Sequence, residues 1–223
     1  MIDCLNIKQM DNEMYQRLYQ LASEERKKKA DRYRDREDSK RCVVAELLLR
    51  AALLDTRQIR MPSIEYGAYG KPYVEAVEGF YYNLSHSGEW VVLGYSDNEV
   101  GIDIEQVCMT EGRKQVAAMS FSPKEQKYIF EATGKGEDAL RFSKVWTAKE
   151  SYLKYLGTGL SKCMSSFMVD VHSGCVRDDF IPDENVRINS LFLSKGYCIS
   201  ACGKYSGMVI NIVKVEELLE RFE

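Results

Sequence analysis

The sequence predicts an α+β protein built from two similar halves, in which helices pack on small antiparallel sheets. Apolar residues recur at helical spacing in three long segments, residues 12–55, 111–131 and 137–156. Short segments rich in aromatic and β-branched residues follow them, separated by turn-forming residues. A weak internal similarity between residues 82–90 and 197–205 indicates that this arrangement occurs twice.

The two similar segments share Tyr, Ser and Gly at matching positions. They predict a division near residue 108, into an N-terminal half (1–108) and a C-terminal half (109–223). Two charged pairs at i,i+4 spacing on helices support the repeat: Glu46 with Arg50, and Glu150 with Lys154. Chance similarity is the alternative, because short strands draw on a limited alphabet of residues.

The N-terminal half is predicted to begin with helical structure over residues 12–55. Its charged part, which includes Lys28 and Lys29, is either a solvated helix face or an anion-binding edge. Pro and Gly then punctuate residues 59–77, which indicates short strands and turns. Three further strands are expected at 80–84, 90–95 and 100–104, with Ser85-His86-Ser87-Gly88 as the turn between the first two.

The C-terminal half is predicted to contain helices over residues 111–131 and 137–156. Ser122 and Pro123 have the residue types of a helix start, and Gly157 follows as a helix stop. Short strands and a last helix complete the half, at 166–171, 187–193, 197–201, 207–213 and 214–222.

Composition narrows the class of protein. The 223 residues are 45% hydrophobic and 29% charged, with a net charge of −3, so the balance is that of a folded soluble protein and does not indicate a nucleic-acid partner. Seven cysteines without Cys-x-x-Cys spacing and only two histidines predict reduced thiols rather than disulfides or a zinc site. We therefore expect a cytoplasmic protein without a targeting segment or a membrane partner.

The segment Gly101-Ile102-Asp103-Ile104-Glu105 places two carboxylates on one face of a strand. Neighbouring carboxylates repel each other, and a hard cation removes that cost. Magnesium prefers oxygen ligands and takes one or two protein carboxylates beside water and phosphate. The alternative is an ordinary amphipathic edge strand with solvated acids.

The helix segment Trp146 to Lys154 places Glu150 and Lys154 on one face. Glu150 is a candidate metal ligand or base, and Lys154 a candidate phosphate contact. The alternative is a surface ion pair beside a packed tryptophan. In the turn segment, Ser85 and His86 offer hydrogen-bond donors to a phosphate, or they only stabilise a hairpin.

Taken together, these segments resemble the 4′-phosphopantetheinyl transferase family in order and spacing. The motifs that carry the resemblance are Gly70-Lys71-Pro72, Asn83 to Ser87, Gly101 to Glu105, Phe121-Ser122-Pro123-Lys124-Glu125 and Trp146 to Lys154. Length and the two-half layout match the longer, Sfp-like type, whose members are pseudo-dimers within one chain. The resemblance implies transfer of 4′-phosphopantetheine from coenzyme A to a serine of an acyl or peptidyl carrier protein.

The resemblance also implies a role for each matching position. Asp103, Glu105 and Glu150 would hold Mg²⁺, with Mn²⁺ as a possible substitute. Glu150 would also act as the base, and Lys154 would contact the pyrophosphate of coenzyme A. The implied contacts of coenzyme A are Lys71, Ser85, His86 and, in the N-terminal basic region, Arg41, Lys28 and Lys29. Glu125 matches a family glutamate to which we assign no role.

A carrier protein would dock on an apolar and locally basic patch around Met119, Phe121 and Lys124, and a monomer is expected. Two other functions are open at this point. The chain could be a module that binds coenzyme A or carrier proteins without activity, or another magnesium-dependent phosphohydrolase using the same carboxylates.

Overall fold

The computed structural model describes residues 1–179, 185–193, 196–204 and 207–222. The chain begins with strand β1 (Ile2–Asn6), a short 3-10 helix (Ile7–Gln9), helices α1 (Asn12–Leu21), α2 (Glu24–Ala30) and α3 (Arg36–Arg57), and strands β2 (Ile64–Tyr66), β3 (Pro72–Val74), β4 (Tyr81–Ser87) and β5 (Trp90–Ser96). It continues with β6 (Val100–Gln106), α4 (Glu111–Ser120), α5 (Pro123–Phe130) and α6 (Glu137–Leu156). The last elements are two 3-10 turns (Gly159–Ser161 and Met164–Ser166), strands β7 (Met168–Asp170), β8 (Cys175–Arg177), β9 (Arg187–Leu193), β10 (Tyr197–Gly203) and β11 (Ile210–Ile212), and helix α7 (Val215–Glu220).

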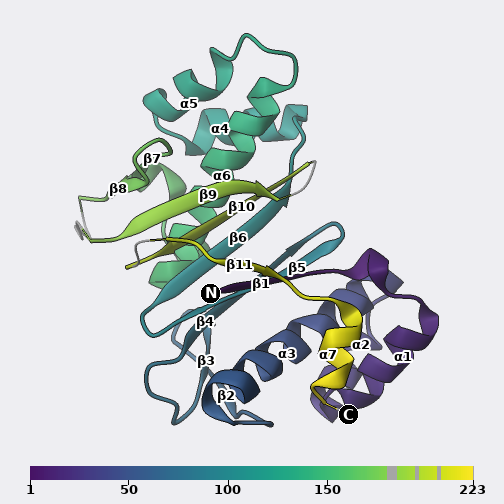
Figure 1. The fold of residues 1–223 in the computed structure, drawn as a ribbon. Coiled ribbons are helices and arrows are strands. Elements are labelled where there is room, and N and C mark those ends of the chain that lie inside the picture. Colours follow the sequence, from purple (N-terminus) through teal and green to yellow (C-terminus); the bar gives the residue numbers. More distant parts are fainter. Residues whose placement is uncertain (180–184, 194–195, 205–206, 223) are drawn as a thin grey trace.

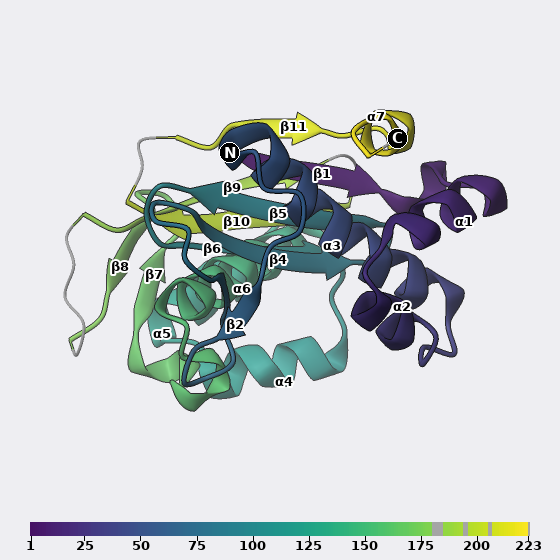
Figure 2. The ribbon, with the colours of Figure 1, turned by 90° about the horizontal axis from the view of Figure 1, so that it is seen from below.

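The strands form two main sheets with the orders β11-β1-β5-β4 and β6-β10-β9-β8-β7, while β2 and β3 form a separate hairpin. Helices α1, α2, α3 and α7 lie beside the first sheet, and α4, α5 and α6 lie beside the second (Figure 1). Seen from below, α4, α5 and α6 share one side of the molecule, and β11 with α7 lies along β1 on the other (Figure 2). The predicted α+β class is therefore confirmed.

Local sequence explains where the helices begin and end. The expected helix 12–55 is three helices, because Ser23 and Asp35 accept backbone hydrogen bonds as new N-caps. The expected helix 111–131 is likewise two helices, because the Ser122–Glu125 capping box begins α5. Helix α6 has the predicted bounds and ends at Gly157, whose φ of 70° is the left-handed conformation that glycine adopts readily.

The predicted turn Ser85–Gly88 was wrong. Strand β4 extends to Ser87, and the turn is the pair Gly88-Glu89, because Ser87 already pairs with Trp90 in β5. Strands β1 and β8 were not predicted. All strands of the first sheet were expected to be antiparallel, but β1 and β11 pair in parallel.

The two sheets repeat one arrangement of strands. In each, the strand before the helices pairs with the second strand of the later hairpin: β1 with β5, and β6 with β10. Asn6 lies opposite Trp90, and Gln106 lies opposite Tyr197, so Trp90–Ser96 corresponds to Tyr197–Gly203. The sequence similarity proposed between residues 82–90 and 197–205 aligned β4 with β10. These strands do not correspond, because the counterpart of β10 in the first sheet is β5. The last residue of the second segment, Tyr205, lies outside the described residues.

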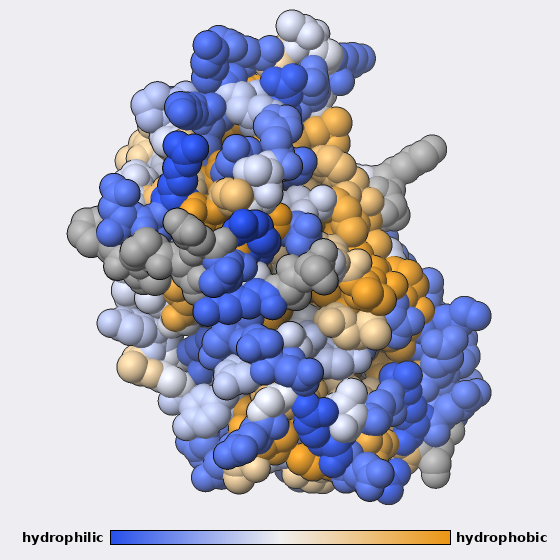
Figure 3. Space-filling view, turned by 60° about the vertical axis from the view of Figure 1, so that its left-hand side comes forward, coloured by the Kyte–Doolittle hydropathy of each residue, from blue (hydrophilic) through white to orange (hydrophobic). Residues whose placement is uncertain are grey.

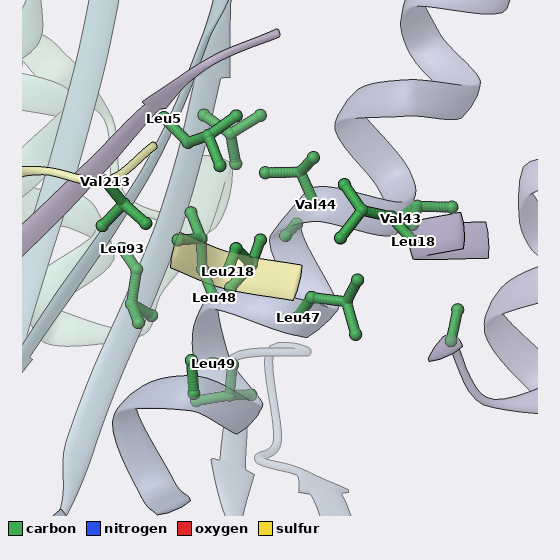
Figure 4. Close-up of a cluster of buried hydrophobic side chains, with 14 of the residues drawn as sticks. Leu5, Leu18, Val43, Val44, Leu47, Leu48, Leu49, Leu93, Val213 and Leu218 are labelled. Atoms are coloured by element: carbon green, nitrogen blue, oxygen red, sulfur yellow. The ribbon is translucent and has the colours of Figure 1, made fainter. Parts of the chain in front are cut away.

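The change from one sheet to the other falls between β5 and β6, while the division near residue 108 stays a prediction. The end of the chain returns to the first sheet, where β11 pairs with β1. Figure 4 shows the core that this return completes, with Val213 and Leu218 facing Leu48 of α3 and Leu93 of β5. A second core surrounds α6, and a third lies between β1, β5, β6 and β10.

The molecular surface is mainly polar. Figure 3 shows one face on which hydrophilic side chains predominate and hydrophobic ones gather in a band along one edge. Among the described residues, no helix combines the length and the apolar character needed to cross a membrane.

Candidate active site

The site lies where β4, at the edge of the first sheet, meets β6, at the edge of the second. These strands share no backbone ladder. Alternate side chains of β4 take its place: Asn83 Oδ1, Ser85 Oγ and Ser87 Oγ accept the backbone N–H groups of Ile102, Ile104 and Gln106, at 3.0, 3.3 and 3.1 Å. The period of two along a strand aims all three side chains at the same neighbour. The Asn-x-Ser-x-Ser pattern therefore joins the two main sheets.

Helix α6 covers this junction and supplies Glu150 and Lys154. It packs closely on β6, since a Cβ at Gly101 would lie 2.0 Å from the carbonyl oxygen of Ser151. A cavity of about 320 Å³ opens at the junction, lined by Leu84, Ser85, His86, Asp103, Glu105, Trp146, Glu150 and Lys154. The residues come from β4, β6 and α6, so both halves build the pocket.

Asp103 is the most deeply buried acid of the pocket, with 5% of its surface exposed. Its Oδ1 accepts hydrogen bonds from Lys154 Nζ at 2.7 Å and from Ser85 Oγ at 2.9 Å. Within the described part of the chain, its Oδ2 has no hydrogen-bond partner, although it is buried. Burial raises the pKa of Asp103, and the neighbouring Lys154 and Ser85 partly offset this shift.

Two more carboxylates share the pocket. Burial and the negative charge of Asp103 raise the pKa of Glu105, which Arg113 partly offsets. Burial and the charges of Asp103 and Glu105 also raise the pKa of Glu150. Neighbouring carboxylates thus contribute to the raised pKa values of Glu105 and Glu150, which agrees with three acids sharing one pocket.

The pocket's donor set fits a hard divalent cation. In the described part of the chain, no three acidic, histidine or cysteine side chains are grouped closely enough to form a ready-made metal site. Magnesium needs only one or two protein carboxylates when water and phosphate complete its shell. The unpartnered Oδ2 of Asp103 and the neighbouring acids Glu105 and Glu150 supply such oxygen ligands.

His86 and Arg41 lie close to each other beside the β4–β5 turn. His86 lines the cavity, and desolvation together with the positive charges of Arg41 and Lys154 lowers its pKa. Arg41 donates to the carbonyl oxygen of Gly88 and to Asp38. The structure thus brings Arg41 from α3 to the β4–β5 turn, near His86, which is another of the predicted coenzyme A contacts.

The other predicted coenzyme A contacts lie away from the cavity. Lys71 donates to Glu99 at 2.5 Å and to the carbonyl oxygens of Val100 and Tyr155, and it borders a separate cavity of about 650 Å³. Lys28 and Lys29 are exposed at the end of α2. None of these three lysines lines the pocket that contains the acids.

Glu125 has a structural position. It is buried, pairs with the fully buried Lys149 at 3.0 Å, and accepts the backbone N–H groups of Ser122 and Val169. Lys149 also donates to the carbonyl oxygens of Met164 and Phe167. The Phe-Ser-x-x-Glu and Trp-x-x-Lys-Glu motifs are therefore held together by a buried ion pair outside the pocket.

The sequence prediction missed Arg113 of α4, whose guanidinium lies 3.1 Å from Glu105. No local signal marks it, because it stands eight positions after Glu105 and reaches back through the fold. Ser87 was noticed only as part of a motif, yet it donates to the same carboxylate at 3.3 Å.

Acids, a lysine and a histidine converging at a junction of two halves define a pocket suited to phosphate groups and a cation. Residues 99–207 match the family model described as the 4′-phosphopantetheinyl transferase superfamily, and residues 9–98 match that of the 4′-phosphopantetheinyl transferase N-terminal region. The 4′-phosphopantetheinyl transferase gsp of Aneurinibacillus migulanus is 32% identical over 232 residues, covering 100% of this chain and 95% of that protein.

The relatives from Bacillus subtilis include the next two proteins. A 4′-phosphopantetheinyl transferase is 30% identical over 209 residues, covering 91% of this chain and 92% of that protein. The enzyme Sfp of strain 168 is 29% identical over 216 residues, covering 94% and 95%. This chain belongs to the 4′-phosphopantetheinyl transferase superfamily and is of the longer, Sfp-like type.

Proposed function

We propose that the protein is a transferase that moves 4′-phosphopantetheine from coenzyme A to a serine hydroxyl of an acyl or peptidyl carrier protein. The products are the holo-carrier protein and adenosine 3′,5′-bisphosphate. The observation that carries the proposal is the pocket in which Asp103, Glu105, Glu150 and Lys154 converge. Family membership favours this reaction over a binding module or a phosphohydrolase.

Asp103, Glu105 and Glu150 would hold Mg²⁺, or Mn²⁺ in its place. When bound, the cation neutralises charge on the pyrophosphate, which is the main requirement of phosphoryl-transfer chemistry. The unpartnered Oδ2 of Asp103 supports this assignment.

The protein's own groups direct the transfer. The serine oxygen forms a bond to the β-phosphorus of coenzyme A, and the bond from that phosphorus to the bridging oxygen breaks. Glu150 faces the pocket and accepts the serine proton, directly or through a water molecule. Lys154 faces the same pocket and balances the negative charge that develops on the departing bisphosphate.

His86 is a proposed contact of the phosphates of coenzyme A because it lines the pocket, and Arg41 is proposed as a second contact because its positive charge lies close to His86. Ser85 lines the pocket, but its hydroxyl already bonds Asp103, Lys154 and the N–H of Ile104. We propose that it acts mainly by orienting those groups. The contacts predicted for Lys28, Lys29 and Lys71 stay predictions.

The predicted carrier-docking patch needs one correction. Phe121 is buried against Phe142 and Trp146, so it cannot contact a partner. Met119 is 82% exposed and Lys124 is exposed, and both remain available for an acidic carrier helix. Lys124→Glu should raise KM for the carrier protein and leave coenzyme A binding unchanged; equal carrier kinetics would exclude Lys124 from the interface.

We propose that the protein acts as a monomer in the cytoplasm. Both halves that build the pocket belong to one chain, so a second copy is not needed to complete it. All seven cysteines are free thiols, which agrees with a reducing compartment. Light scattering at working concentrations tests the oligomeric state.

The decisive experiment is the intact mass of an apo carrier protein after incubation with this protein, coenzyme A and Mg²⁺. We expect a gain of one phosphopantetheine, which is lost with a chelator and with Glu150→Ala. Coenzyme A binding without any gain on fatty-acid, polyketide and peptidyl carriers would favour the binding module. Coenzyme A breakdown without a carrier protein would favour the phosphohydrolase.

A further inference from the structure

Arg113 is a partly exposed arginine whose guanidinium makes several hydrogen bonds. Its Nη1 donates to the carbonyl oxygens of Gln106 and Cys108, at 3.0 and 3.2 Å. Its Nη2 donates to Glu105 Oε2 at 3.1 Å. Three acceptors from one segment thus fix the plane of the guanidinium.

The Arg113 side chain also packs against an aromatic ring, that of Phe142. The guanidinium carbon lies 5.5 Å from the ring centre of Phe142, within the range of a cation–π contact. Phe142 stacks on Trp146 with ring centres 6.0 Å apart, and Trp146 lines the pocket. The position of Arg113 is therefore tied to the wall of the site.

Both groups that hold Glu105 act on one oxygen. Ser87 Oγ donates to Oε2 at 3.3 Å, and it is itself anchored by the backbone N–H of Gln106. Arg113 donates to the same Oε2, and among the described residues no hydrogen bond to Oε1 is found. A carboxylate whose hydrogen bonds all go to one oxygen has a fixed orientation, and its second oxygen stays available as a ligand.

We propose that Arg113 is a positioning residue that orients Glu105 for the divalent cation, with Ser87 as its partner on the other half of the chain. The proposal rests on the cation site of the proposed function. Groups that orient a metal ligand typically change metal affinity about 10–100-fold when they are removed. A lysine cannot replace the arginine fully, because one ammonium does not reproduce the fork that bonds Glu105 and two carbonyl oxygens together.

Arg141 offers a matched control. It pairs with Glu137 at 2.6 Å, donates to the carbonyl oxygen of Tyr128 at 2.6 Å, and lies 5.0 Å from the Tyr128 ring centre. The contact types equal those of Arg113, but neither Arg141 nor Glu137 lines the pocket. Arg141→Met therefore measures how the loss of an arginine with these contacts affects folding, without a change in the pocket.

The test measures Mn²⁺ binding at saturating coenzyme A, by the electron paramagnetic resonance signal of free Mn²⁺. We expect Arg113→Met to weaken Mn²⁺ binding about 10–100-fold, Arg113→Lys to lie between it and the wild type, and Arg141→Met to match the wild type. In transfer assays, Arg113→Met should raise the Mg²⁺ concentration for half-maximal activity, while kcat at saturating Mg²⁺ stays near the wild-type value.

The outcomes separate this inference from the proposed function. The proposed cation site itself would be wrong if the wild-type protein binds no Mn²⁺, or if the Asp103→Asn and Glu150→Ala variants bind Mn²⁺ with normal affinity. A wild-type protein that binds Mn²⁺ through those acids, with unchanged affinity in Arg113→Met, would overturn the inference alone. If Arg113→Met fails to fold by circular dichroism, Arg113→Lys decides, and wild-type Mn²⁺ affinity in that variant overturns the proposal.

Discussion

Asp103 is buried with one oxygen engaged by two donors and the other unpartnered. A buried carboxylate with an unmade contact costs free energy of folding, so its retention at this place favours a functional role. Asp178 is a useful comparison, because it is equally buried but bonds Tyr152 Oη at 2.9 Å and Lys162 at 3.0 Å, outside the pocket.

Asp103→Asn should therefore reduce transfer about a hundredfold or more, the scale on which a lost electrostatic stabiliser acts. Its melting temperature should fall less than that of Asp178→Asn, because the Lys154 side chain that loses its carboxylate partner is 27% exposed, whereas the Lys162 side chain is 12% exposed. Asp178→Asn should do the reverse. It leaves the Lys162 ammonium without its carboxylate, at about 3–5 kcal/mol of folding free energy, while activity of the folded protein persists. Carrier mass assays and thermal unfolding of both variants test the contrast.

The raised pKa values of Asp103, Glu105 and Glu150 predict a pH dependence with a definite sign. Each acid holds its proton to higher pH when folded than when unfolded. Without a cation, stability should therefore fall as pH rises from the ordinary carboxyl range through the raised values. Mg²⁺ competes with these protons, so with Mg²⁺ and coenzyme A the fall should shrink or reverse. Melting temperature against pH, with and without both ligands, measures this; parallel curves would contradict it.

At the scale of elements, the contact between α6 and β6 sets the geometry of the pocket. Gly101 allows this contact, since an added Cβ would lie 2.0 Å from Ser151 O and 2.3 Å from Tyr155 N. Glu150 and Lys154 lie on the same helix, so any shift of α6 moves them relative to Asp103.

Gly101→Ala should destabilise the protein by about 1–3 kcal/mol or more, the usual cost of overpacking, and should lower kcat by displacing α6. Gly112→Ala is the control. Gly112 is an exposed residue of α4, where a Cβ meets only Thr110 Oγ1 at 3.8 Å, and alanine there should stabilise by about 0.4–1 kcal/mol. Urea unfolding and steady-state kinetics of the two variants test this prediction. Equal stabilities of Gly101→Ala and Gly112→Ala would mean that the contact between α6 and β6 does not require glycine at position 101.

The Glu125–Lys149 pair links α5 to α6 and to the start of β7. Burial lowers the pKa of Lys149, and Glu125 partly restores it. Glu125→Gln should cost about 3–5 kcal/mol, because the charge of Lys149 is then buried without its partner. Glu137→Gln breaks the partly exposed pair with Arg141 and should cost less than about 1 kcal/mol. Denaturant unfolding of both variants compares these costs; similar losses would contradict the assignment.

Elements with strong local signals could be predicted from the sequence. Helix α6 has the expected bounds because Gly157 fixes its end, and α5 begins at Ser122 because its capping box is local. The turn after β4 was misplaced because Ser85 and Ser87 have turn-forming side chains. In the fold, those side chains are used by β6, a strand that no local pattern connects to them.

At the scale of the whole molecule, the acids of the candidate site were predicted, but not the groups that orient them. Asp103, Glu150 and Lys154 were found because their motifs are compact in sequence. Arg113 reaches Glu105 only in the folded chain, and Lys71 donates to the carbonyl oxygens of Val100 in β6 and Tyr155 in α6. Such long-range contacts leave no spacing pattern in the chain.

The two halves also explain why the pocket forms at one junction. By register, Ile2-Asp3 of β1 corresponds to Ile102-Asp103 of β6. The outer edge of β6 meets only side chains of β4, which leaves room for the pocket. The outer edge of β1 is closed by the backbone of β11, and Asn211 Nδ2 donates to Asp3 Oδ1 at 2.9 Å. Strand β11 thus occupies the edge of β1 that corresponds to the edge of β6 at which the pocket lies.

This return makes the end of the chain part of the first core. Leu218 of α7 is fully buried among residues of α3 and β5, and Arg221 pairs with Asp55 of α3 at 3.3 Å. Leu218→Ala should therefore destabilise the protein by about 2–5 kcal/mol. Hydrogen exchange should speed up in α1, α3 and β1, although the substitution lies some 160 residues beyond α3 in sequence. Leu140→Ala, at a site 41% exposed on α6, is the control and should change stability by about 0.5 kcal/mol or less. Exchange that speeds up only within α7 would mean that the C-terminal segment is an appendage rather than a part of the N-terminal fold.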